Sequence, residues 1–242
     1  MTGPAQPLIQ TLQRRDTLSP GELGALWSLS WREAGVAAGS VIIPDHSRPS
    51  ESCLLLDGYA ARSAVVRSGG RQISALHVRG DFIDLHGLLL RVLDHSISAL
   101  TDCRVAFVPH QARRELAAQW PHLGRLLFAM TAIDGAIQRN WIVCLGRRQP
   151  VAHLAQIICD LYVRLQIVGA VSGDAYDFPF TQEQLADMLG LSTVHTNRTV
   201  QKLRATGLIT WQSRSVRIHD VDGLFEFADF DPTYLSLTRE PR

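Results

Sequence analysis

The sequence predicts an α+β protein with an N-terminal all-β barrel or roll, a long helix and a C-terminal winged helix-turn-helix. Short apolar runs separated by Gly, Pro and Ser indicate the strands of the first part. A stretch without helix breakers, apart from tolerated glycines, indicates the long helix. Two coupled helical patterns followed by an alternating hairpin pattern indicate the last part. We expect domains at residues 1–120, 121–148 and 149–242.

The composition favours a folded protein outside the membrane. Of 242 residues, 46% are hydrophobic and 19% charged, which supplies a core and argues against global disorder. The N-terminal stretch MTGPAQPLIQTLQRRD lacks the apolar segment of a signal peptide, and no uncharged apolar run approaches the ~18 residues that span a bilayer. We therefore expect a cytoplasmic protein with no membrane partner.

The cysteines are far apart and form no C-x-x-C pair. They are Cys53, Cys103, Cys144 and Cys159. This spacing argues against a zinc ribbon, a clustered iron–sulfur site and a secreted disulfide framework. We expect buried, reduced thiols and no metal site.

The strands of the first part are expected between Leu29 and His110. The apolar runs there are GVAAGSVIIP, SCLLLDGYAARSAVV, RQISALHV and SALTDCRVAFVP. Their short length and flanking turn residues are typical of an all-β barrel or roll. The segment RGDFIDLHGLL, from Arg79 to Leu89, interrupts them with a short loop and turn.

The long helix is expected to begin at Pro121 and to end near Arg147. One of its apolar rows consists of Leu123, Leu126, Met130, Ile133, Ile137 and Cys144, and the other of Phe128, Thr131, Gly135, Gln138, Ile142 and Leu145. A helix that is apolar on two sides must be buried on two sides. One row is therefore expected to pack on the strands and the other to form a coiled-coil seam with a second subunit. Composition alone favours the Leu126 row as the seam, and a monomer that buries both rows is the alternative.

The C-terminal helix pair has start and stop signals at both helices. Thr181 and Gln184 fit a capping box at the start of the first helix. Gly190 can take the left-handed conformation that ends a helix, and Ser192 can cap the next one. The second helix is expected over 193–205, and the runs LITW and SVRI after it alternate like a small hairpin.

The charge around the second helix is one-sided. From Met188 to His219 there are five Lys or Arg and no Asp or Glu: Arg198, Lys202, Arg204, Arg214 and Arg217. Phosphate contacts by such residues supply most non-specific DNA affinity. We therefore expect double-stranded DNA as the partner, and we expect the acidic segment that follows, Asp220 to Asp231, to pack away from it. An ordinary helical hairpin with a solvated basic face is the alternative.

Nearly the whole chain, from about Leu23 to Ile218, resembles the Crp/Fnr superfamily of bacterial transcription regulators. The resemblance rests on AAGSVII, LLLDGYA, GRQISALHVRGDFIDLHGLL, SALTDCRVAFVP, a long helix and FPFTQEQLADMLGLSTVHTNRTVQKLRATGLI, in that order. It implies a cyclic-nucleotide-binding-like β-roll, a dimerisation helix and a winged helix-turn-helix. It also implies a homodimer, an effector in the roll and, for an activator, contact with RNA polymerase.

The resemblance places an effector pocket at Asp81, Phe82, Leu85, His86, Arg91, His95, Ser96, Gln138 and Arg139. Cyclic-AMP-binding members carry a Glu where this chain has Leu85, and an Arg-Ser pair where it has His95 and Ser96. Loss of that Arg removes a permanently charged, bidentate phosphate partner, because a histidine is mostly neutral at neutral pH. Arg91 is close in sequence and could replace that Arg, so cyclic AMP is disfavoured but stays an alternative. We expect the roll to bind another ligand or to hold the protein constitutively competent.

Two other sensor chemistries of the superfamily are not favoured either. An oxygen-labile iron–sulfur cluster needs cysteines near the N-terminus, and the first cysteine is Cys53. Haem needs an axial ligand, which His77, His86 or His95 could supply, but histidines on a polar rim are more often solvated or hydrogen-bonded.

By family position, four residues of the second helix face the bases: Thr193, Val194, Asn197 and Arg198. Arg198 is the best candidate for a bidentate contact to guanine, and Val194 can offer apolar contact to a thymine methyl. The remaining DNA contacts are expected at Gln201, Lys202, Arg204 and Arg214. The family likeness assigns the Phe128 row to the dimer seam, with Gln138 as its polar register element.

Other function classes are disfavoured by the sequence. A ligand-binding or protein-interaction module that never meets DNA would not need a basic segment free of acidic residues. An enzyme is disfavoured because no nucleophile–base set, phosphate-cradling glycine loop or metal-ligand spacing is present in the sequence.

Overall fold

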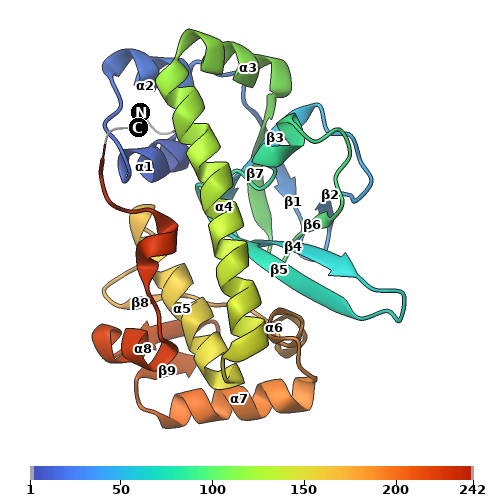
Figure 1. Cartoon of the computed structure of the whole chain (residues 1–242), viewed down its shortest axis with the longest axis vertical. Coiled ribbons are helices and arrows are strands. Elements are labelled where there is room, and N and C mark those ends of the chain that lie inside the picture. The colour runs from blue at the N-terminus through green and yellow to red at the C-terminus, as the bar shows by residue number, and fades with distance from the viewer. Residues whose placement is uncertain (1–2, 241–242) are drawn as a thin grey trace. The chain divides into compact units, whose positions relative to one another are not determined.

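In the computed structural model, residues 3–240 are described. The chain forms two compact units (Figure 1). The first unit comprises Met1–Ser63, Ala75–Ala136 and Leu235–Arg242, and the second comprises Ala64–Ser74 and Ile137–Tyr234. The mixture of helix and sheet confirms the predicted fold class.

Antiparallel strands make up the roll. They are β1 (Arg32–Val36), β2 (Val41–Ile43), β3 (Glu51–Asp57), β4 (Ala60–Val65), β5 (Arg71–His77), β6 (Ser96–Ala99) and β7 (Cys103–Pro109). One sheet has the order β1-β7-β3 and the other β2-β6-β4-β5. In the first, Cys53 of β3 lies opposite Phe107 of β7. The Arg79–Leu89 segment was expected to be a short loop and turn. It forms a turn followed by a short 3-10 helix, η1 (Leu85–Leu88).

Three helices of the first unit were not predicted: α1 (Gln6–Gln13), α2 (Pro20–Trp27) and α3 (His110–Gln119). Figure 1 shows them beside the N-terminal half of the long helix α4 (Pro121–Arg147). The buried side chains of Leu8, Leu26, Leu116 and Leu123 bring all four helices into one apolar core. The same core includes Phe82 from the turn of the roll, so these helices cover part of the sheet.

Helix α4 begins and ends where the sequence predicts. In the Leu126 row, Leu123, Leu126, Ile133, Ile137 and Cys144 are buried. In the Phe128 row, Phe128 and Ile142 are each 68% exposed. The two rows therefore differ sharply in exposure, although both are apolar.

The second unit contains α5 (Pro150–Ile167), β8 (Ala175–Asp177), α6 (Gln182–Leu189), α7 (Thr193–Ala205), β9 (Ile209–Gln212), β10 (Ser215–Ile218), α8 (Val221–Ala228) and η2 (Pro232–Leu235). Its sheet has the order β8-β10-β9, in which Val216 of β10 lies opposite Trp211 and Tyr176. Strand β8 and helix α8 were not predicted. The ring of Phe178, after β8, lies 4.8 Å from the ring centroids of both Phe180 and Trp211, which anchors the sheet.

All four cysteines are free and buried, as predicted. Within residues 3–240, no group of three or more His, Cys, Asp or Glu side chains could hold a metal ion. No helix in this range is long and apolar enough to cross a bilayer.

Candidate nucleic-acid interface

Local hydrogen bonds fix the connection between α6 and α7. The Gln184 amide nitrogen donates to Thr181 Oγ1 (3.1 Å), and the Thr181 amide nitrogen donates to Gln184 Oε1 (2.9 Å), which completes the predicted capping box. Gly190 ends α6 with φ at +65°, a conformation that favours glycine. Ser192 then caps α7 by accepting from the amide nitrogen of His195. The sequence therefore specifies the start and end of α6 and the start of α7.

One face of α7 is buried in the second unit. Thr196 and Leu203 are fully buried, and Val200 is 6% exposed. The hydroxyl groups of Thr196 and Thr199 donate to carbonyl oxygens one turn earlier, at 3.0 and 2.9 Å. These two hydroxyl groups therefore have acceptors inside the helix. Contacts to bases or phosphates are expected from the opposite face of α7.

The opposite face of α7 carries the predicted DNA-contacting residues. The structure places seven of them together there, all exposed: Thr193, Val194, Asn197, Arg198, Gln201, Lys202 and Arg204. Val194 is 62% exposed and lies among these polar residues. Within the described chain, no carboxylate forms an ion pair with Arg198, Lys202 or Arg204. The face thus presents unpaired cations around an apolar centre.

The hairpin of β9 and β10 carries Arg214, the eighth predicted contact. Its turn is tight because Ser213 adopts φ at +53°, a left-handed conformation that is uncommon for a residue other than glycine. The carbonyl oxygen of Arg214 accepts from the amide nitrogen of Phe178 at 2.7 Å. The backbone at Arg214 is therefore held while its side chain is exposed.

A buried polar network in α5 was not predicted. Arg164 donates to Asp160 at 2.9 Å, and the Tyr234 hydroxyl donates to the same carboxylate at 2.6 Å. Gln156 donates to the Tyr234 hydroxyl at 3.0 Å. Burial and the neighbouring Asp160 charge raise the pKa of Tyr234, so its hydroxyl stays protonated and donating. The Asp-x-x-x-Arg spacing in α5 could have indicated the pair of Asp160 and Arg164. No local pattern indicates Tyr234, which is 74 residues away from Asp160.

In the roll, two of the predicted effector-pocket residues meet directly. His86 Nε2 and His95 Nε2 lie 3.2 Å apart, and His95 Nδ1 lies 2.7 Å from the Asp94 carboxylate. Beside them Arg62 of β4 pairs with Asp134 of α4 at 2.9 Å, with only 6% of the Arg62 side chain exposed. Burial, followed by the Arg62 charge, lowers the pKa of His86 from 6.5 to about 4. Arg62, Asp94 and Asp134 were not predicted: Arg62 and Asp134 are far from the histidines in the sequence, whereas Asp94 directly precedes His95.

The other predicted pocket residues have different surroundings. Phe82 and Leu85 lie in the apolar core, and Arg91 is exposed. Asp81 accepts from the amide nitrogen of Val78 (2.8 Å), and Ser96 accepts from that of Asp45 (3.2 Å). Gln138 and Arg139 belong to the second unit. Of the set, His86 and His95 are brought into direct contact, and Phe82 and Leu85 share one apolar core.

The predicted seam residues form an open row along α4. Phe128 and Ile142 are the most exposed, and Leu145 is 42% exposed. Thr131, Gly135 and Gln138 are half-buried. The row therefore offers apolar side chains with a polar residue among them.

Comparison with known proteins gives consistent matches. Residues 152–227 match the family described as the Crp-like helix-turn-helix domain. The chain is 27% identical over 198 residues to the transcriptional activator protein FnrL of Cereibacter sphaeroides, covering 80% of this chain and 79% of the relative. It is 29% identical over 210 residues to a probable transcriptional activator of Rhizobium leguminosarum bv. viciae, covering 86% and 85%.

The fold is similar to that of a solved structure. FixK2 from Bradyrhizobium japonicum superposes with a TM-score of 0.73 at 20% sequence identity, covering 82% of this chain and 98% of FixK2.

Proposed function

We propose that this chain, which belongs to the Crp/Fnr superfamily of bacterial transcription regulators, binds DNA sequence-specifically and regulates transcription. The observation that carries the proposal is the exposed face of α7, where Arg198, Lys202 and Arg204 have no carboxylate partner within the described chain. Cations arranged in this way on a capped helix neutralise backbone phosphates, which supplies the larger part of DNA affinity. The family consists of regulators, and we assign the chain no catalytic role.

The active form is a homodimer. The Phe128 row leaves large apolar side chains exposed along α4, and a second copy of the helix buries them in a coiled-coil seam. Gln138, as the polar residue of that row, sets the register. A two-fold dimer places its two recognition helices in successive major grooves about 34 Å apart, so the operator is an inverted repeat.

The base-contacting residues lie at the N-terminal half of α7. Arg198 reads a guanine through its O6 and N7 atoms, and Val194 makes apolar contact with a thymine methyl. Gln201, Lys202, Arg204 and Arg214 contact the DNA at the flanks of these positions. Such a regulator works where the DNA is, in the cytoplasm, and as an activator it would contact RNA polymerase.

The roll does not favour cyclic AMP as its effector. Leu85 and His95 replace the polar and cationic partners that cyclic-AMP-binding members use, and Leu85 is buried in the apolar core. The buried Arg62 is already paired with Asp134. We infer that the roll takes a different ligand or keeps the protein competent without one.

Selection of bound fragments from random duplexes tests the proposal. The expected product is an inverted repeat with a two-fold centre, bound by two chains in sedimentation. A double variant, Arg198→Ala with Lys202→Ala, should lose the preference, whereas Arg48→Ala with Arg67→Ala removes the same charge from exposed sites outside α7 and should keep it. Recovery of unrelated sequences by the wild-type chain would favour the ligand-binding alternative.

A further inference from the structure

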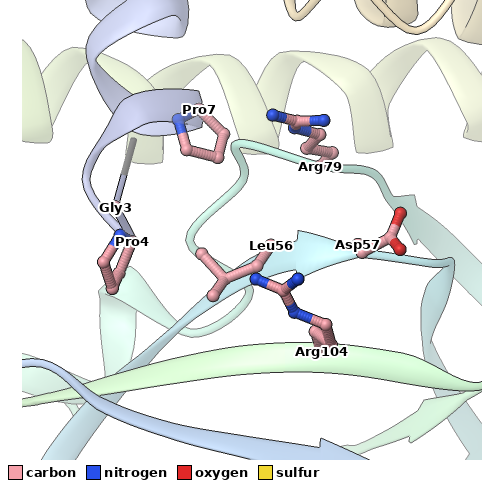
Figure 2. A pocket seen from close by; sticks show the side chains of 7 residues that line it. All are labelled: Gly3, Pro4, Pro7, Leu56, Asp57, Arg79 and Arg104. Carbon is pink, nitrogen blue, oxygen red and sulfur yellow. The ribbon is translucent and has the colours of Figure 1, made fainter. Parts of the chain in front are cut away.

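A small cavity of about 150 Å³ lies between the start of α1 and the roll. Its lining residues are Gly3, Pro4, Pro7, Leu56, Asp57, Arg79 and Arg104, all of the first unit. In Figure 2, Arg104 extends from β7 toward Leu56, and the guanidinium group of Arg79 lies on the other side, near Pro7. The cavity would hold about five water molecules at the ~30 Å³ that each occupies in the liquid.

The two arginines are poorly neutralised by the protein. Within residues 3–240, the Nε atom of Arg79 is buried and has no hydrogen-bond acceptor. Arg104 is exposed and lies 3.5 Å from Glu33, which is itself half exposed. A buried donor without a partner costs about 1–3 kcal/mol, so such a group calls for an explanation such as a bound ion or ligand.

The start of α1 adds to the positive potential. Ala5 is the N-cap residue, and it provides no side-chain acceptor for the amide groups of the first turn. The residues around that N-terminus, Gly3, Pro4 and Pro7, line the cavity themselves. The Gln6 amide already donates to the Gly3 carbonyl and Pro7 has no amide hydrogen, so α1 contributes mainly the positive end of its helix dipole.

We propose that this cavity binds a small oxyanion, the carboxylate or phosphate group of a metabolite, between Arg79 and Arg104. Each guanidinium group can offer two parallel N–H donors to one carboxylate or phosphate. Asp57, the one acidic residue of the lining, accepts from a hydroxyl or amino group elsewhere on the same ligand. The volume of the cavity suits the anionic group of a small metabolite.

This site is separate from the DNA surface and from the His86–His95 pair. None of its seven lining residues belongs to either group. The proposal is therefore independent of DNA binding, and its failure would leave the proposed function intact. An oxyanion held here would link the start of α1 to β7 of the roll.

Calorimetry of the full-length protein with inorganic phosphate and with malate tests the proposal in two arms. At least one anion should bind with one site per chain at low ionic strength, and the tighter arm identifies the anionic group. Arg79→Gln should weaken that binding by about tenfold or more, which corresponds to about 1.4 kcal/mol. Because Arg79 is half-buried, Arg104→Gln, an exposed change, serves as the second variant and should also weaken binding.

Two controls make the outcome decisive. Arg67→Gln removes an exposed arginine outside the cavity, and Arg198→Ala removes one from the DNA surface; both should bind the anion as the wild type does. The proposal is overturned if neither anion binds the wild type at millimolar concentration, or if all four variants weaken binding equally.

Discussion

The recognition helix α7 and the His86–His95 cluster differ in where their charged side chains find partners. On α7 the cations are exposed and have no carboxylate partner among the described residues. In the roll, Arg62 is buried and its partner Asp134 comes from 72 positions away in the chain. We infer from this difference that α7 binds a partner outside the protein, whereas Arg62 of the roll already has its carboxylate partner within it. Substitutions should therefore change binding in the first region and folding in the second.

The largest effect on stability is expected inside α7, where a buried side chain and an exposed one occupy consecutive positions. Leu203→Ala removes a fully buried side chain and should lower the free energy of unfolding by about 2–5 kcal/mol through cavity formation. The adjacent Arg204→Ala is exposed and should stay within about 0.5 kcal/mol of the wild type. Urea unfolding measures both. Equal losses would mean that the two faces of the helix are not distinct.

The next effect concerns the buried ion pair of the roll. Arg62→Ala leaves Asp134 without its cation, and removing one partner of a fully buried pair costs about 3–5 kcal/mol. Because the Asp134 side chain is 29% exposed, we expect a smaller loss, about 2 kcal/mol. The double variant with Asp134→Ala should recover part of it in a thermal unfolding experiment. A double variant less stable than the sum of both single changes would contradict the pairing.

On the DNA side, Arg198→Ala should cost about 1–3 kcal/mol of binding free energy and relax the preference at one base pair of each half-site. Its thermal stability should not change, because the side chain is exposed. Lys202→Ala is the matched control, and it should weaken all sequences alike and reduce the salt slope by about one. Quantitative gel shifts on single-base variants of the selected operator decide between these outcomes. Uniform weakening by Arg198→Ala would remove its role as a base contact.

Acid should destabilise the second unit through His153. This side chain is 2% exposed, and burial, followed by the Arg148 charge, lowers its pKa from 6.5 to about 4. The unfolded chain therefore takes up a proton near pH 6.5 that the folded chain refuses until about pH 4, so stability falls as the pH drops through this window. His153→Gln should lose less stability than the wild type between pH 7 and pH 5, by about 1–2 kcal/mol. Identical pH profiles of the two proteins in urea unfolding would exclude this cause.

The helices of the second unit could be predicted because their signals are local. Thr181, Gly190 and Ser192 each act on residues within one turn, so both bounds of α6 and the start of α7 follow from neighbouring residues. Helix α8 has such a signal too, since Asp220 accepts from the amide nitrogen of Gly223 at 2.9 Å. From the sequence we predicted only an acidic segment there. The helix was missed although its capping residue was present.

Other elements had no usable local signal. Strand β8 is three residues long, and its partner β10 lies some 40 positions later in the chain. Helix α3 begins after Pro109 without a side-chain cap, directly at the end of a strand. In the candidate site, the exposed residues of α7 follow from helical spacing, but the contact between Arg62 and Asp134 depends on how β4 and α4 pack. Such pairings come from tertiary structure and cannot be read from adjacent residues.

The four buried thiols have a practical consequence. Burial raises the pKa of each, so the thiolate that reacts with oxidants and alkylating reagents is scarce while the chain is closed. Cys53 and Cys103 belong to the first unit, and Cys144 and Cys159 to the second. The alkylation rate of each pair of thiols therefore reports how often its own unit opens transiently. No label has to be engineered for this measurement.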